Sequence, residues 1–184
     1  MDLYELIKRR RSIRTFKSKP VSAEVIKKML KAALWAPSGS NIHPLRFIIV
    51  RDQNVLEMLK SFSPGWLGDS PVGIVICIDQ DEALTKGGKL GKEIMSLLDV
   101  GFAAQNILLI AHSMGLGACP IRGFSIEGIT EILELPDRLK PELIISLGYP
   151  LEIPDPPPRP ALQEITFLNT YGNKVSFVKG REDE

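Results

Sequence analysis

The sequence predicts one globular domain of mixed helices and short buried strands. Its 184 residues, 44% of them hydrophobic, are enough for one well-buried core. Amphipathic helical patterns alternate with short apolar runs along most of the chain. The segment from about Lys92 to Met114 is apolar on every side of a helical wheel, which predicts a helix covered by neighbours all round.

The N-terminal half begins with two helical patterns. Asp2 and Glu5 form a capping box, so a short helix should carry the following arginines at its C-terminal end. Ser22 should cap a second helix, whose apolar stripe ends before Pro37. The members of that stripe are Val25, Ile26, Met29, Leu30, Ala33 and Leu34.

The next elements alternate between strand and helix. Phe47–Val50 is predicted as a strand, and Asn54 is predicted to cap a short helix through about Phe62. Val72–Ile78 reads as a fully buried strand. Residues 80 to 91 are polar and rich in glycine, so we expect a mobile loop there.

After the long apolar helix, Gly115-Leu116-Gly117 should form a left-handed cap. Cys119–Phe124 is then expected to be extended, Ser125 should cap a helix that ends before Pro136, and Leu143–Leu147 should be another buried strand.

The C-terminal part differs in composition. Pro154–Pro160 contains five prolines and should be stiff and extended. Val175–Val178 is predicted as a late strand without a nearby hairpin partner, suited to pairing with the sheet edge of another subunit. We therefore expect a single domain over residues 1–184, with an arm from about 150 that reaches a partner.

Charge and composition restrict the possible functions. The net charge of +1 gives no global field for nucleic acid or an anionic membrane, so a positive site must be local, as at Arg9–Arg11. A nucleic-acid-binding module remains a third alternative, disfavoured because no basic stripe occurs elsewhere. Asp99 and other polar residues interrupt the Ile94–Leu116 stretch, which predicts a buried helix and no membrane span.

Cysteine, histidine and the N-terminus add further expectations. Cys77 and Cys119 lack CxxC spacing and are expected to be buried in a reducing compartment, with a minor alternative that Cys119 lines a ligand site. His43 and His112 have no partners at metal-ligand spacing, so we expect no metal site. Met1–Glu5 enters a helical pattern without a signal peptide, which predicts a cytoplasmic protein.

Two motifs carry most of the functional information. Arg10–Phe16 places guanidinium groups beside a hydroxyl, and both are donors suited to phosphate oxygens. Taken alone, such an arginine run is more often a solvated helix end. Ala36–Pro44 is a turn of small polar residues, in which the backbone could approach a flat ligand closely.

Together these segments resemble the nitroreductase family of FMN-dependent enzymes. The resemblance extends to the central helix ending in Gly115-Leu116-Gly117, the Cys119–Phe124 segment, the Leu147–Pro150 strand end and the lone Arg159. It implies an α+β three-layer sandwich with a mixed, mostly antiparallel sheet between helices. It also implies an obligate homodimer with an exchanged C-terminal strand and one FMN at each end of the interface.

The resemblance assigns roles to particular residues. Arg10, Arg11 and Ser12 match positions that hold the FMN phosphate and ribityl chain, and Arg159 matches a basic residue that closes over the phosphate. Arg14 matches a residue at the N1/C2-carbonyl edge of the flavin, where a cation stabilises the charge that reduction creates.

Two further segments match parts of the flavin site. The residues of the first segment, which are expected to reach across from the partner subunit, are Pro37, Ser38, Gly39 and Asn41. The residues of the second segment, which are expected to lie against the flavin ring, are Pro120, Ile121 and Gly123. The sequence departs from many members at His43, Leu45 and Arg122, which affects the inference of substrate choice.

The implied reaction is a two-step cycle without a nucleophilic side chain. NAD(P)H reduces the flavin at N5 and leaves, and a small organic acceptor such as a nitroaromatic or quinone then takes the electrons. The alternatives are an FMN-binding protein without turnover and a specialised superfamily member, either a reductive dehalogenase or a flavin-cleaving enzyme. Trp66 could form a pocket wall, whereas Trp35 is more often a core residue at such a helix end.

Overall fold

The computed structural model describes residues 2–175, which divide between Pro154 and Asp155 into two compact units. The helices of the first unit are α1 (Leu3–Arg9), α2 (Ala23–Leu34), α3 (Gln53–Ser61), α4 (Gln80–Leu90), α5 (Ser96–Ser113) and α6 (Ile126–Ile132), with two short turns, η1 (Gly39–Asn41) and η2 (Gly91–Met95). Its strands are β1 (Leu45–Val50), β2 (Val72–Asp79), β3 (Gly117–Ile121) and β4 (Leu139–Gly148).

The four strands form one sheet in the order β1-β2-β4-β3, and all three strand pairings are antiparallel. Ser12 adds an isolated parallel bridge to Ala118 on β3. Every residue of β2 is buried, which explains why its sequence is a continuous apolar run instead of an alternating one. β1 lies at one edge of the sheet.

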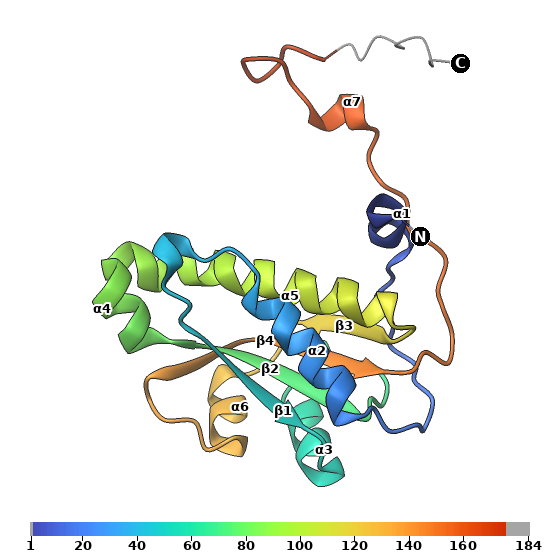
Figure 1. Cartoon of the computed structure of the whole chain (residues 1–184), viewed down its shortest axis with the longest axis vertical. Coiled ribbons are helices and arrows are strands. Elements are labelled where there is room, and N and C mark those ends of the chain that lie inside the picture. The colour runs from blue at the N-terminus through green and yellow to red at the C-terminus, as the bar shows by residue number, and fades with distance from the viewer. Residues whose placement is uncertain (1, 176–184) are drawn as a thin grey trace. The chain divides into compact units, whose positions relative to one another are not determined.

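Helices cover both faces of the sheet, in three layers (Figure 1). Ile74 and Ile76 of β2 pack into the core beneath α2 and α5. Val75 and Cys77, which point the other way, pack with Leu59 of α3 and Ile129 of α6. The alternation of a strand thus builds two cores from one buried run, and the predicted α+β sandwich is confirmed.

Most of the predicted helix starts are confirmed. The Asp2 side chain accepts a hydrogen bond from Glu5 N at 2.9 Å, and Ser22 and Ser125 cap α2 and α6 in the same way. Gly115, with a φ of 75°, ends α5 in the left-handed conformation that glycine adopts without strain.

Three local predictions are wrong. Residues 80–91 are largely helical, because Asp79 caps α4 and only Gly88, at φ 60° and ψ −160°, interrupts it before η2. The cap of α3 is Asp52 and not Asn54, because the Asp52 carboxylate accepts from Asn54 N and Val55 N. Trp35 is 88% exposed and therefore lies outside the core of this chain.

In the second unit, the described residues up to Val175 form a short helix, α7 (Leu162–Ile165), and an isolated bridge between Phe167 and Lys174. Its residues from Asp155 to Pro160 are exposed and without regular structure, as their proline content predicts. The predicted strand Val175–Val178 lies, after Val175, outside the described residues. The single-domain prediction with an arm from about 150 remains a prediction.

A row of large apolar side chains is exposed from the last residue of α4 along the outer face of η2 and α5. It consists of Leu90, Ile94, Leu97, Leu98 and Phe102, each between 46% and 58% exposed, and we call it the α5 outer face. The helical run Gln80–Ser113 has the length and composition of a membrane-spanning helix. However, α5 packs on the sheet, and its buried Asp99 binds a loop of the same chain, so we assign the run to the protein core.

Candidate functional site

The arginine segment is fixed along β3 and the end of β4. Ile13 N donates to Ala118 O at 3.1 Å, and Lys17 N donates to Tyr149 O at 2.8 Å. A Cβ on Gly117 would stand 2.6 Å from the Cβ of Ile13, so this glycine lets the segment approach the strand. Because Ile13 points into the core, Ser12 and Arg14 on either side of it project elsewhere.

A loop after α3 joins this segment to the residues that follow β3. A Cβ on Gly68, whose φ is 76°, would stand 1.9 Å from Arg14 O, so the two backbones are in close contact. Three residues earlier in the same loop, Gly65 N donates to Gly123 O at 3.1 Å. The 65–68 loop therefore brings together Arg14 and the segment Pro120–Gly123, which are more than a hundred residues apart in sequence.

Pro120, Arg122 and Gly123 are exposed, whereas Ile121 is buried in the core beneath α3 and α6. Arg122 binds the buried Glu142 carboxylate at 3.2 Å. Trp66, expected as a possible pocket wall, is only 4% exposed and belongs to the same core, so that expectation is wrong.

The arginines at the end of α1 line a cavity of about 110 Å³ next to the last turn of α5. Its lining includes Arg9, Arg10, Arg11 and His112. Burial, and then the charges of Arg10, Arg11 and Arg9, lower the pKa of His112. Arg11 also donates to the carbonyl of Lys8 at 3.0 Å, so its guanidinium is partly used to cap α1.

The loop between α2 and β1 is held from below by Asp99 of α5, a buried carboxylate that is 3% exposed. Its Oδ2 accepts from Ser38 Oγ at 2.7 Å, and its Oδ1 accepts from Gly39 N at 2.9 Å. Ser38 Oγ accepts in turn from His43 N at 2.9 Å. In the sequence, Asp99 indicates only that the apolar stretch is no membrane span. A lone carboxylate in an apolar helix also indicates a buried hydrogen-bond partner.

This loop has an unusual backbone. Ser40, Asn41 and His43 all have positive φ values, of 50°, 56° and 53°. Each such residue costs about 1 kcal/mol or more, and such strain is found where surrounding contacts impose it. Gly39 must be small, because a Cβ there would stand 2.3 Å from Met95 Cε. Exposed His43 and Asn41 are joined by a 2.8 Å hydrogen bond between Nε2 and Oδ1.

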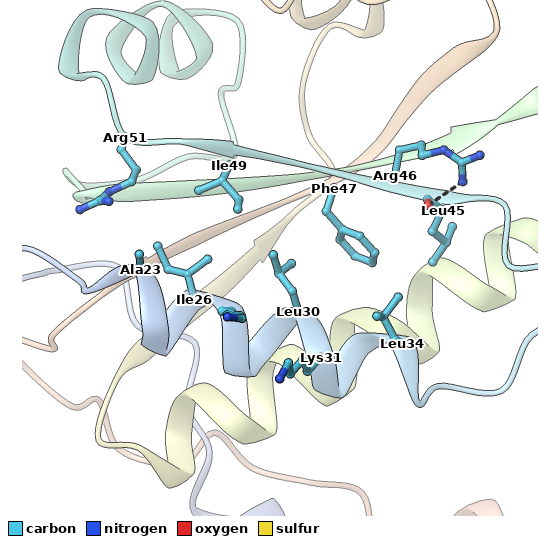
Figure 2. A pocket seen from close by; sticks show the side chains of 11 residues that line it. Ala23, Ile26, Leu30, Lys31, Leu34, Leu45, Arg46, Phe47, Ile49 and Arg51 are labelled. Atoms are coloured by element: carbon cyan, nitrogen blue, oxygen red, sulfur yellow. Dashed lines mark hydrogen bonds between the residues drawn. The ribbon is translucent and has the colours of Figure 1, made fainter.

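A cavity of about 500 Å³ is an open groove between α2 and the edge strand β1. Figure 2 shows Leu30 and Leu34 of α2 facing Phe47 of β1 across it, with Arg46 and Arg51 near its two ends. Its walls are mainly aliphatic and aromatic, so it suits an apolar segment better than a phosphate.

The structure thus brings Ser12, Arg14 and Pro120–Gly123 into one region, with Arg10 and Arg11 beside it at the end of α1. The hydrogen bonds of Ser38 and Gly39 lead instead to α5. Arg159 lies exposed in the second unit, so its pairing with Arg10 remains a prediction. Among the described residues there is no cluster of side chains that could hold a metal ion.

Comparison with known proteins decides the family. Residues 7–65 and 58–149 match the model of the nitroreductase family. A Methanothermobacter thermautotrophicus protein, provisionally named an NADH dehydrogenase/NAD(P)H nitroreductase, is 38% identical in an alignment of 161 residues that covers 84% of this chain and 80% of that protein. The chain belongs to the nitroreductase family.

Two further nitroreductase-like proteins carry more specific names. The FMN reductase (NADPH) of Bacillus subtilis is 31% identical over 91% of this chain and 73% of its own length. The crystal structure of the NADPH:FMN oxidoreductase of Vibrio harveyi, complexed with NAD⁺, has a TM-score of 0.83 and 29% identity, covering 91% of this chain and 77% of that one.

Proposed function

We propose that this nitroreductase-family member is an FMN-dependent NAD(P)H oxidoreductase that reduces a small organic acceptor in a two-step cycle. The observation that carries the proposal is the junction of Arg14 and Pro120–Gly123 at the 65–68 loop. The names of its relatives, an FMN reductase and an NADPH:FMN oxidoreductase, support the same cofactor and electron donor.

The residues at this junction fit FMN chemically. Exposed backbone at Pro120 and Gly123, with Gly65 against it, lets a flat ring lie close to the main chain. Arg10, Arg11 and Ser12 supply donors for a phosphate, and the cavity between α1 and α5 gives that end of the site a positive surface. Bound FMN would supply the hydride acceptor and donor that the protein side chains lack.

Within the proposed site, Arg14 has an electrostatic role. Its backbone is held against Gly68 while its side chain is exposed, so its charge can face the ring edge that becomes negative on reduction. Exposed Pro120 and Gly123 support the ring, the buried Ile121 side chain anchors the segment between them, and Arg159 adds a cation to the phosphate. Positioning and electrostatics account for the rest of the contribution of the protein.

We further propose a cytoplasmic homodimer in which Pro37, Ser38, Gly39 and Asn41 of one subunit cover the flavin of the other. The exposed α5 outer face is a stripe of the kind that a second copy would bury. The edge strand β1 and its apolar groove offer a place for the C-terminal strand of that copy (Figure 2).

The deciding experiment is the visible spectrum of the purified protein, or of the protein mixed with FMN and then desalted. Retained flavin bands that bleach on anaerobic addition of NADH or NADPH, and return with a quinone or nitroaromatic acceptor, support the oxidoreductase. Retained flavin that neither nucleotide reduces would favour an FMN-binding protein without turnover. Loss of FMN to a degradation product under oxygen would favour a flavin-cleaving enzyme, and a protein that binds no FMN would overturn the proposal.

A further inference from the structure

The loop proposed to cover the neighbouring flavin ends a continuous chain of hydrogen bonds that begins inside the protein. Asp99 Oδ2 accepts from Ser38 Oγ, and Ser38 Oγ accepts from the backbone N–H of His43. The His43 ring then bonds Asn41 Oδ1 at 2.8 Å. A buried carboxylate of α5 is thereby linked, through two residues of the loop, to an exposed amide.

The direction of the last bond determines what Asn41 can offer. An amide oxygen only accepts hydrogen bonds, so in this contact His43 Nε2 is the donor and Asn41 Oδ1 is the acceptor. With Oδ1 bound to His43, the Nδ2 group of Asn41 points away from the ring. Asn41 therefore presents its N–H donors to a ligand, while one lone pair of Oδ1 is already used by His43.

The first bonds of the chain have a similar consequence for Ser38. Its single hydroxyl hydrogen is donated to Asp99, so Ser38 stabilises the loop and has no hydrogen left to donate to a ligand. The positive φ values of Ser40, Asn41 and His43 need such support, because none of these residues favours that conformation as glycine does.

We propose that Asp99 and His43 are positioning residues that fix Asn41 as a hydrogen-bond donor to an acceptor atom of the flavin ring. This inference rests on the proposed FMN function. The acceptor atoms of that ring are its two carbonyl oxygens and the unprotonated N1 and N5, whereas N3–H is a donor. A donor amide therefore selects the carbonyl and N5 edges and disfavours contact with N3–H.

The test uses His43→Leu, which removes the ring donor, and His43→Gln, whose amide can still donate to Asn41 Oδ1. Loss of one orienting hydrogen bond should weaken FMN binding by about three- to tenfold in the first variant. The flavin absorption maximum and the reduction potential should shift as well, and His43→Gln should restore all three quantities. Melting temperatures of the cofactor-free proteins check that both variants fold.

A double-mutant cycle separates positioning from general loop support. Asn41→Leu should cause the same spectral and potential shifts, and adding His43→Leu to it should change little further, because the two residues act through one contact. Ser38→Ala, which cuts the link to His43 N but leaves Asp99 bonded to Gly39 N, should shift the spectrum in the same direction.

A second readout does not depend on the cofactor. The side-chain amide signal of Asn41 in nuclear magnetic resonance spectra of the cofactor-free protein should be resolved in wild type and His43→Gln and averaged in His43→Leu. Equal behaviour of the Leu and Gln variants, or additive effects in the cycle, would overturn the inference. If wild-type protein binds no FMN while the amide signal behaves as expected, the proposed function fails and the orienting contact stands.

Discussion

At the scale of single residues, the arginines of one short segment have different surroundings and should have different effects. Arg10 lines the cavity beside His112, whereas Arg14 is exposed and held through its backbone against Gly68. Replacement of Arg10 should therefore affect binding of the phosphate, and replacement of Arg14 should affect the flavin ring.

We predict that Arg14→Gln lowers the midpoint potential of bound flavin and slows its reduction by NAD(P)H by on the order of tenfold. The reason is the loss of a cation beside charge that develops only on reduction. Spectroelectrochemistry and anaerobic stopped-flow measurements give both quantities, with Arg14→Lys as the charge-conserving control. If potential and rate are unchanged and only FMN affinity falls, Arg14 is a binding residue alone.

His112 should make stability depend on pH. Burial and three arginines lower its pKa below the usual 6.5, so between the two values the unfolded chain binds more protons than the folded one. The free energy of unfolding should therefore fall as pH falls below 6.5, and His112→Gln should reduce this dependence. Urea titrations at several pH values measure it, and a histidine pKa at or above 6.5 by magnetic resonance would contradict the prediction.

The same histidine can report on the anion. If a phosphate group binds the arginines of this cavity, their repulsion of the imidazolium is offset, so the pKa of His112 should rise when FMN is added. Riboflavin, which lacks the phosphate, is the matched control and should leave the pKa unchanged. An equal rise with both ligands would place the phosphate elsewhere.

At the scale of elements, sequence was sufficient wherever local chemistry decides the outcome. The capping side chains of Asp2, Ser22 and Ser125, and the buried run of β2, were all predictable. Residues 80–91 were misread because glycine and polar content suggested a loop, whereas Asp79 and Glu82 form a helix start that the sequence does contain. Glycine did mark a break there, but only at Gly88.

The candidate site was predictable as a set of residues but not as an arrangement. Arg14 and Gly123 meet through a loop whose only sequence signal is its glycines, and Asp99 meets Ser38 across 61 positions of sequence. Such pairings arise from tertiary packing and have no local pattern. The core position predicted for Trp35 is wrong for a similar reason. A helical pattern alone does not tell whether a helix face is covered by its own chain, by a second chain or by solvent.

The contact between α6 and α3 can be tested at Gly128. Gly128 is buried, and a Cβ there would stand 2.3 Å from Cδ1 of the half-exposed Phe62 ring. We expect Gly128→Ala to destabilise the fold by about 1–3 kcal/mol despite the better helix propensity of alanine. Glu131→Ala, at an exposed position of the same helix, should change stability by less than about 0.5 kcal/mol. Denaturant titration distinguishes the two, and equal stabilities would mean that Phe62 moves aside freely.

At the scale of the whole molecule, the α5 outer face and the groove beside β1 are both apolar and open in a single chain. We predict that Phe102→Glu yields a monomer with at least tenfold weaker FMN binding, because an interface over the α5 outer face would bury an unpaired charge. Light scattering gives the mass, and Leu3→Glu, an exposed apolar position on α1, is the control. A monomer that still binds FMN tightly would exclude a shared pocket.

A shared pocket also predicts complementation between defective chains. One chain carries Arg10→Ala and Arg159→Ala, and the other carries Asn41→Ala. Each homodimer should be impaired, whereas a mixed dimer contains one pocket in which all three residues are intact. Activity should therefore reappear when the two are mixed under conditions of subunit exchange. No recovery, despite heterodimers detected by mass spectrometry, would indicate pockets formed within single subunits.

Because Cys77 lies on the buried strand β2, its rate of chemical labelling can report how often the folded protein opens. Burial, and then the nearby charge of Glu142, raise the pKa of Cys77 to about 12, so at neutral pH almost no thiolate exists in the folded state. In a Cys119→Ala background, an alkylating reagent should therefore modify Cys77 only in molecules whose central strand has opened. The labelling rate measures how often that happens, without denaturant. Binding of a cofactor to the folded state alone should slow labelling by the factor 1 + [L]/Kd, where [L] is the free cofactor concentration.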